Sequence, residues 1–162
     1  MAARQETASP GGRAAAIVAP LQPSACLQRR RLVLEDVAPL KPGAGEIVIS
    51  VKACGLNFLD GLMIQGKYQT KPPFPFSPGA EVAGVVKALG EGVSGPPVGT
   101  RVLAMAGHGG YAEEVAVPAS GVFPIPDAMD FTTAASLIIT YGTSHHAFKD
   151  RAHLQAGETV LV

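Results

Sequence analysis

The sequence predicts a mostly β domain that is followed by the beginning of an α/β domain. Nineteen glycines and fourteen prolines divide the chain into many short segments, a pattern typical of strands joined by turns. From Asp130 onward the apolar residues take a helical spacing instead. The chain then reaches an apolar, β-branched run at residues 159–162, which is typical of a buried strand in a parallel sheet.

Composition excludes several classes of protein. The 162 residues fit one domain, or one domain with a fragment of another, and 47% of them are hydrophobic. Thirteen basic and thirteen acidic residues leave no net charge that would attract nucleic acid or an anionic membrane. Only two cysteines occur, Cys26 and Cys54, and they favour a reducing, cytoplasmic location. Residues 1–12 lack the apolar stretch of a secretory signal and predict a flexible lead, with a mitochondrial location left open.

Alternating apolar residues and the turns between them predict seven strands and one helix before Pro126. The clearest strand has Ile47, Ile49 and Val51 on one face. The helix has Asn57 as its N-cap and ends at Gly66. The expected strands are 14–18, 31–37, 46–53, 80–89, 101–106, 111–117 and 122–125, and the expected helix is 56–65.

After Asp130, a helical face contains Phe131, Ala134 and Ile138. Gly142 interrupts this stretch, since glycine is unfavourable within a helix. The sequence therefore predicts either two helices or one kinked helix here. A turn at residues 156–158 comes before the final apolar run.

Six segments occur in an order that resembles one superfamily. They are Lys-Ala-Cys-Gly-Leu-Asn-Phe-Leu-Asp at 52–60, Gly-Lys-Tyr at 66–68 with 76–86, Val-Gly-Thr-Arg-Val at 98–102, 109–113 with 123–126, 134–147, and 155–162. Together they resemble the N-terminal portion of the medium-chain dehydrogenase/reductase superfamily. The resemblance is strongest to its zinc-free, zeta-crystallin-like quinone oxidoreductases, and it extends over nearly the whole chain from Arg13.

This resemblance implies a domain organisation. Residues 13–128 would form a GroES-like, partly open β-barrel that carries the substrate side of the site. Residues 129–162 would supply linking helices and the first strand of an incomplete Rossmann-type domain. The Gly-rich loop that holds the cofactor's phosphates in such domains would follow Val162 directly. The glycine cluster at 107–110 precedes a strand rather than a helix, so it predicts a hairpin turn.

The resemblance also addresses zinc. The zinc alcohol dehydrogenases of this superfamily use a cysteine and a histidine at places where this chain has Asn57 and Ala80. Neither side chain supplies the thiolate or imidazole that catalytic zinc needs. No cysteine follows Cys54, so the four-cysteine structural zinc lobe is missing too. His145 and His146 are adjacent and would point in different directions on a helix. We therefore expect no metal site.

The implied activity is hydride transfer from NADPH to a quinone or a related conjugated carbonyl. An enal, an enone or an enoyl thioester is a neighbouring possibility. The partner would be this small-molecule substrate, not nucleic acid or a membrane, and a full-length form would be a homodimer. The alternative is a non-catalytic GroES-like binding module, or a truncated product without an enzymatic role.

Three residues are candidates for contact with NADPH, and each has a structural alternative. Asn57 would hydrogen-bond the nicotinamide ribose or the substrate, or would only cap its helix. Tyr68 would line the cleft, or would pack on neighbouring prolines. Thr140 would touch the nicotinamide side of the cofactor, or would be an ordinary helix residue. Asp60 and Glu81 also match the superfamily, with structural roles expected and, for Glu81, a basic partner. No catalytic residue is assigned.

We expect no stoichiometric zinc in the purified protein, because Asn57 and Ala80 occupy the two ligand places. Elemental analysis of protein purified without a metal-affinity tag measures this directly. About one tightly held zinc ion per chain would contradict the expectation.

Overall fold

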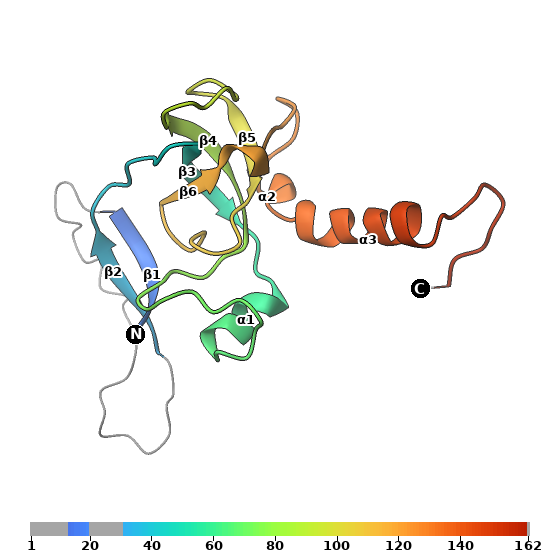
Figure 1. The fold of residues 1–162 in the computed structure, drawn as a ribbon, viewed down its shortest axis with the longest axis horizontal. Helices are drawn as coiled ribbons and strands as arrows, with labels where there is room; N and C mark the ends of the chain where they lie inside the picture. The colour runs from blue at the N-terminus through green and yellow to red at the C-terminus, as the bar shows by residue number, and fades with distance from the viewer. Residues whose placement is uncertain (1–12, 20–30, 162) are drawn as a thin grey trace, which may run out of the picture.

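The barrel is built from two antiparallel sheets (Figure 1). The computed structural model describes residues 13–19 and 31–161, so the expected lead at 1–12 lies outside the described residues. The larger sheet has the strand order β6-β3-β4-β5-β7, and β1 pairs with β2 in the smaller one. The strands are β1 Arg13–Ala19, β2 Arg31–Val37, β3 Glu46–Cys54, β4 Glu81–Leu89, β5 Arg101–Met105, β6 Glu114–Pro118 and β7 Val122–Pro124.

Six of the seven strands agree with the sequence expectation to within one residue at each end, but the start of β6 was predicted wrongly. The expected strand began at Tyr111, whereas β6 begins at Glu114. The Tyr111 N–H donates to the Pro78 carbonyl over 2.9 Å instead of joining the ladder. Ala112 forms only an isolated bridge to Ala15. This bridge links the smaller sheet to the larger one.

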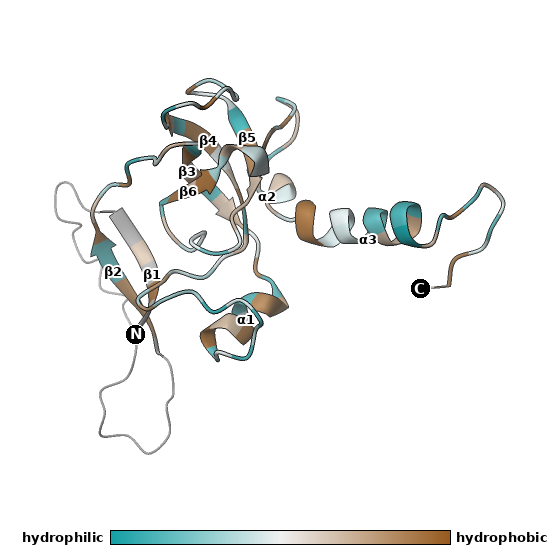
Figure 2. Ribbon diagram, viewed as in Figure 1, coloured by the Kyte–Doolittle hydropathy of each residue, from teal (hydrophilic) through white to brown (hydrophobic). Residues whose placement is uncertain are grey.

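The barrel core consists of aliphatic side chains on facing strands. Figure 2 shows β3 and β6 as hydrophobic ribbons at the centre of the barrel. Gly84 lets β3 and β4 approach closely, because a Cβ atom there would collide with the Ser50 carbonyl oxygen. The buried cluster is Ile47, Ile49, Val82, Val86, Val102, Ala104, Val115, Val117 and Val122.

Helix α1 (Phe58–Ile64) follows β3 and confirms the predicted helix, with Asn57 at the N-cap position. The Asn57 N–H donates to Asp60 Oδ2 over 2.9 Å, which holds the first turn closed. Gly66 has φ of +68° just past the helix end, a backbone conformation that favours glycine. The sequence had placed the helix ends at 56 and 65, two residues and one residue too far out.

Past β7, the chain forms α2 (Phe131–Ala134) and then a longer helical arm at residues 138–151. The arm comprises η2 (Ile138–Gly142), α3 (Thr143–His145) and η3 (His146–Arg151). It projects away from the barrel (Figure 1). The expected interruption at Gly142 is wrong, because Gly142 keeps helical angles of −61° and −42°. The break lies between α2 and the arm, at residues 135–137.

Arg101 fixes the direction in which the chain leaves the barrel. Its guanidinium donates to the main-chain carbonyls of Asp127 and Met129. It also lies over the Phe131 ring, with Cζ 4.6 Å from the ring centroid. Asp130 then caps α2 by accepting the Thr133 N–H over 2.8 Å, and this bond lowers the pKa of the Asp130 carboxyl.

The last described residues are exposed and have no regular secondary structure, so they are not paired in a sheet. The strand expected at 159–162 is therefore wrong for residues 159–161, and Val162 lies outside the described residues. A strand needs a neighbour that satisfies its N–H and C=O groups. No described strand lies beside this segment, and the Leu161 side chain is 99% exposed.

We expect hydrogen exchange to protect residues 46–53 strongly and residues 158–161 hardly at all. β3 is hydrogen-bonded to β4 on one side and to β6 on the other, whereas the end of the chain joins no sheet. Exchange followed by mass spectrometry distinguishes the two segments. Equal protection in a monomeric sample would contradict this expectation.

Candidate functional site

The candidate site is organised by the buried carboxylate of Asp60, which is 1% exposed. Asp60 accepts three hydrogen bonds from separate segments. Oδ2 accepts from the Asn57 N–H over 2.9 Å and from the Tyr111 hydroxyl over 3.1 Å. Oδ1 accepts from the Gly79 N–H over 3.1 Å. The carboxylate therefore joins α1 to the loop before β4 and to the loop before β6.

Tyr111 packs against a glycine that no other residue would replace without strain. Gly79 has φ of +96°, and a Cβ atom there would lie 2.7 Å from the Tyr111 ring. Burial raises the pKa of the Tyr111 hydroxyl, and the charge of Asp60 raises it further. Tyr111 therefore stays a hydrogen-bond donor to Asp60 at neutral pH.

Glu81, at the start of β4, is the second buried carboxylate and is 2% exposed. Its Oε1 accepts from the Asn57 side-chain amide over 3.0 Å. Its Oε2 accepts from the Ile139 N–H over 3.0 Å. These donors take the place of the basic partner that the sequence analysis expected. Glu81 thereby ties the N-terminus of α1 and the first turn of the helical arm to the barrel.

A cleft of about 320 Å³ lies between α1, the end of β5 and the helical arm. Its walls are mostly apolar, with the hydroxyls of Tyr68, Thr70 and Thr143 and the imidazole of His108 added. Sites for small molecules combine apolar walls with a few polar groups in this way. The apolar lining is Leu59, Met63, Ala80, Met105, Gly107 and Ile139.

The three residues predicted to contact the cofactor lie in different surroundings. Tyr68 lines the cleft and packs beside Met63, so it faces the site. The Asn57 amide is directed to Glu81, outside the cleft lining. The Thr140 hydroxyl donates to the Ser136 carbonyl, one turn earlier in the chain. Sequence reasoning missed His108, although the glycines around it indicated a tight turn.

The places that hold zinc ligands in the zinc dehydrogenases lie next to Glu81, on two sides of it. Ala80 is buried and lines the cleft, and Asn57 is hydrogen-bonded to Glu81. Among residues 13–19 and 31–161, no group of three His, Cys, Asp or Glu side chains is placed to hold a metal ion. Burial raises the pKa of the nearby Cys54 thiol to about 12, and the charges of Asp60 and Glu81 add to this.

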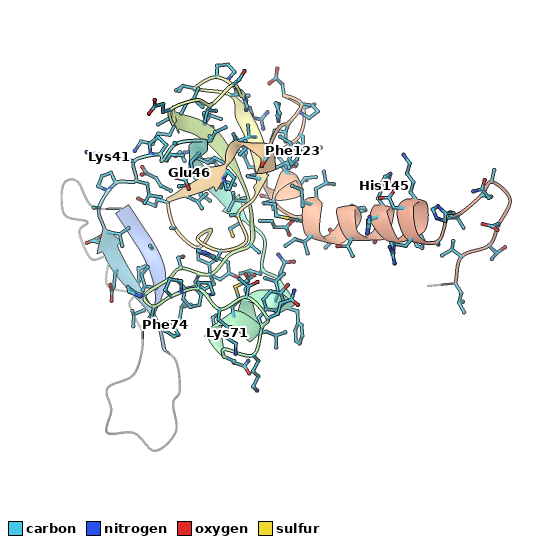
Figure 3. The ribbon with its side chains drawn as sticks, viewed as in Figure 1. Lys41, Glu46, Lys71, Phe74, Phe123 and His145 are labelled. Atoms are coloured by element: carbon cyan, nitrogen blue, oxygen red, sulfur yellow. The ribbon has the colours of Figure 1, made fainter. Side chains whose placement is uncertain are left out.

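An outer groove of about 710 Å³ separates the helical arm from β5 and β7. Figure 3 shows Phe123 on the barrel and His145 on the arm, the two sides of this groove. Leu103, Met105 and Leu137 add further apolar surface. The groove is mostly apolar, and its lining also includes Ser120, Tyr141 and His145.

Comparison with known proteins identifies the family. Residues 43–127, just over half of the chain, match the family model of the alcohol dehydrogenase GroES-like domain. The chain belongs to this family. The expected GroES-like, open barrel is thus confirmed, with the five-stranded sheet left unclosed.

Two curated relatives are similar to most of this chain. The human synaptic vesicle membrane protein VAT-1 homolog is 45% identical over 132 residues, which cover 82% of this chain and 34% of that protein. The quinone oxidoreductase-like protein 2 homolog of Nematostella vectensis is 44% identical over 133 residues, 81% of this chain and 36% of that protein. The chain therefore spans about a third of the length of these curated relatives.

A solved structure shows the same likeness in three dimensions. The quinone oxidoreductase of Thermus thermophilus, also solved in complex with NADPH, superimposes with a TM-score of 0.73 at 36% identity. The match covers 92% of this chain and 44% of that one. The resemblance to quinone oxidoreductases that the motifs indicated is confirmed.

Within the described residues, none of the helices has both the length and the apolar character that crossing a bilayer requires.

We expect Asp60→Ala to destabilise the barrel by about 3 kcal/mol, because three donors lose their acceptor and the Gly79 N–H stays buried. Urea unfolding measures the change. Asp127→Ala removes an exposed carboxylate near the end of the barrel and should change stability by less than about 0.5 kcal/mol. Equal effects of the two substitutions would show that Asp60 does not have this role.

We expect Cys54 to react with iodoacetamide at pH 8 at least about 100-fold more slowly in the folded chain than in urea. A pKa of about 12 keeps the thiol protonated at pH 8, and the thiolate is the reactive form. The rate should climb only as the pH rises well past 9. Mass spectrometry of the Cys54 peptide measures it, and similar folded and unfolded rates would refute the assignment.

Proposed function

We propose that this chain is the substrate-side domain of an NADPH-dependent quinone oxidoreductase that works without zinc. The reaction would be hydride transfer to a quinone or a related conjugated carbonyl. Residues 13–128 would be the catalytic-domain portion, and residues 129–162 would lead into a nucleotide-binding domain. The whole protein would be longer, since the matched segment covers only 34% and 36% of these two relatives.

The cleft beside Tyr68 is the observation that supports this proposal most directly. Its apolar walls suit a flat conjugated ring, and its hydroxyls and imidazole suit the carbonyl oxygens of that ring. Quinone oxidoreductases are among the chain's relatives, and one of them has been solved with NADPH. A quinone needs little acid catalysis to accept a hydride, which agrees with the lack of a buried acid in the cleft lining.

The residues present fit one end of the cofactor. NADPH would supply the hydride when bound, and polar groups at the border of the cleft would orient its nicotinamide end beside the acceptor. Tyr68 is the candidate that faces this space. Asn57 and Thr140 would act from its border, with Glu81 holding the Asn57 amide and the Ile139 N–H in register. Within residues 31–161, no Gly-rich loop lies between a strand and a helix to bind the phosphates.

The proposal of metal-free chemistry rests on the residues at the two zinc-ligand positions, Asn57 and Ala80. Zinc would polarise a carbonyl if three ligands were available. Here Ala80 supplies none, and Asn57 donates to Glu81. Hydrogen bonds from the cleft would have to orient the acceptor instead. We further propose a cytoplasmic protein that dimerises in its full-length form; a fluorescent fusion and sedimentation of the long form test these two points.

We expect the 162-residue chain alone to bind NADPH more weakly than micromolar and to show no quinone turnover. Micromolar binding needs about 8 kcal/mol, and each hydrogen bond at the nicotinamide end adds only about 0.5–1.5 kcal/mol. Isothermal titration and a quinone assay measure both quantities.

A form extended to the length of the relatives is the matched comparison, and it should bind NADPH and reduce quinones. Tyr68→Phe in that form should slow the reduction with little change in stability. Turnover by the short chain would show that the cofactor site is misplaced. An inactive long form would favour the non-catalytic binding module.

A further inference from the structure

A second cavity, of about 300 Å³, lies behind the cleft. We call it the inner cavity. It separates the small β1–β2 sheet from β6 and from the loop that contains the cis Phe74–Pro75 bond. Figure 3 shows Phe74 in this loop, near the small sheet. The apolar side chains that line the inner cavity include Ala15, Ile17, Val37, Phe76, Ala112 and Ala116.

Among the described residues, the carboxylate that borders the inner cavity is that of Glu114, and both of its oxygens are hydrogen-bonded. Glu114 Oε1 accepts from Lys87 Nζ over 2.5 Å, and Oε2 accepts from the Leu40 N–H over 3.1 Å. The Ser77 hydroxyl donates to the adjacent Pro78 carbonyl over 3.4 Å. Because these polar groups are already engaged within the protein, the cavity favours an apolar guest.

His108 borders both the cleft and the inner cavity. Its ring meets the edge of the Phe76 ring at a centroid distance of 6.3 Å, and Phe76 in turn packs with Met63. The backbone around His108 is fixed, since the Gly107 N–H donates to Ala80 and the Gly109 N–H to Ser77. The main chain thus holds His108 at the border of both spaces, and its side chain is exposed.

We propose that the cleft and the inner cavity form one acceptor site divided by His108. The conjugated ring of the acceptor occupies the cleft, and an apolar tail on that ring passes His108 into the inner cavity. This inference rests on the proposed function, and it narrows the substrate class to quinones or enones that carry an alkyl or isoprenoid tail. His108 is then a specificity-determining residue. It sets how readily a tail enters.

The test uses the chain itself and two fully substituted quinones, which resist addition of thiols. Duroquinone carries four methyl groups, and decylubiquinone carries one methyl group, two methoxy groups and a ten-carbon tail. In ¹H–¹⁵N NMR titrations, both should shift the amides of Tyr68 and Thr70, and only decylubiquinone should also shift those of Ala112 and Ala116. Each buried methylene strengthens binding by about fourfold, so decylubiquinone should bind at least about tenfold more tightly.

Substitutions distinguish binding of the tail in the inner cavity from non-specific binding of the tail elsewhere on the protein. Ala116→Leu fills the inner cavity and should abolish the tail's advantage while leaving duroquinone binding unchanged. Ala112→Leu fills the same space if the first variant does not fold. His108→Ala should increase the advantage several-fold, whereas His145→Ala, in the outer groove, should leave it unchanged.

The outcomes distinguish the two proposals. Tail-dependent shifts at residues 120, 121 and 142 in place of Ala112 and Ala116 would place the tail in the outer groove and overturn the divided site. If decylubiquinone still binds more tightly than duroquinone in both Ala116→Leu and Ala112→Leu, the divided site is also overturned. The proposal that the cleft binds a quinone ring would then still stand. If duroquinone shifts neither Tyr68 nor Thr70, the proposed function itself is overturned.

Discussion

Three segments of the barrel meet at the carboxylate of Asp60, and the rest of the site depends on that meeting. Each bond satisfies a donor from a different part of the chain: the start of α1, the turn at Gly79 and the hydroxyl of Tyr111. A buried carboxylate without such donors would carry a large desolvation cost. Because the three bonds offset that cost together, the segments are positioned jointly rather than one at a time.

Glu81 is likewise a buried carboxylate whose hydrogen bonds join separate segments, here at the boundary between the barrel and the helical arm. Two N–H donors, the Asn57 side-chain amide and the Ile139 main chain, each bind one of its carboxylate oxygens. Gly55 has no side chain because a Cβ atom there would lie 2.5 Å from the Glu81 carboxylate. The arm is otherwise exposed, so this bond and the packing of α2 place Ile139 against the cleft. One wall of the candidate site is therefore set by a main-chain hydrogen bond.

The sequence was informative wherever structure depends on neighbours along the chain. Alternation was enough for β2 and β3, and capping chemistry was enough for Asn57. Prediction from the sequence failed where a residue's hydrogen-bonding partner is distant in the chain. Tyr111 leaves the strand pattern because Pro78 and Asp60 hold it, and neither is near it in sequence. Residues 159–161 have a strand composition, but composition does not supply a neighbouring strand.

The same distinction applies to the candidate site. The motifs singled out Asn57, Tyr68 and Thr140, but only the fold shows that Tyr68 faces the cleft. His108 had no signal beyond the glycines around it, since its place between two cavities arises from backbone bonds to residues 77–80. Periodicity carries no information about which cavity a loop residue will border.

Arg101 has an evolutionary consequence. One guanidinium, held by two carbonyls and an aromatic ring, is among the contacts that hold the chain as it leaves the barrel. The barrel core does not include this side chain. A lineage that exchanged Arg101 would keep the barrel core and lose one of the contacts that place α2 against it. Divergence in the position of the helical arm can therefore begin at a residue outside the cleft lining.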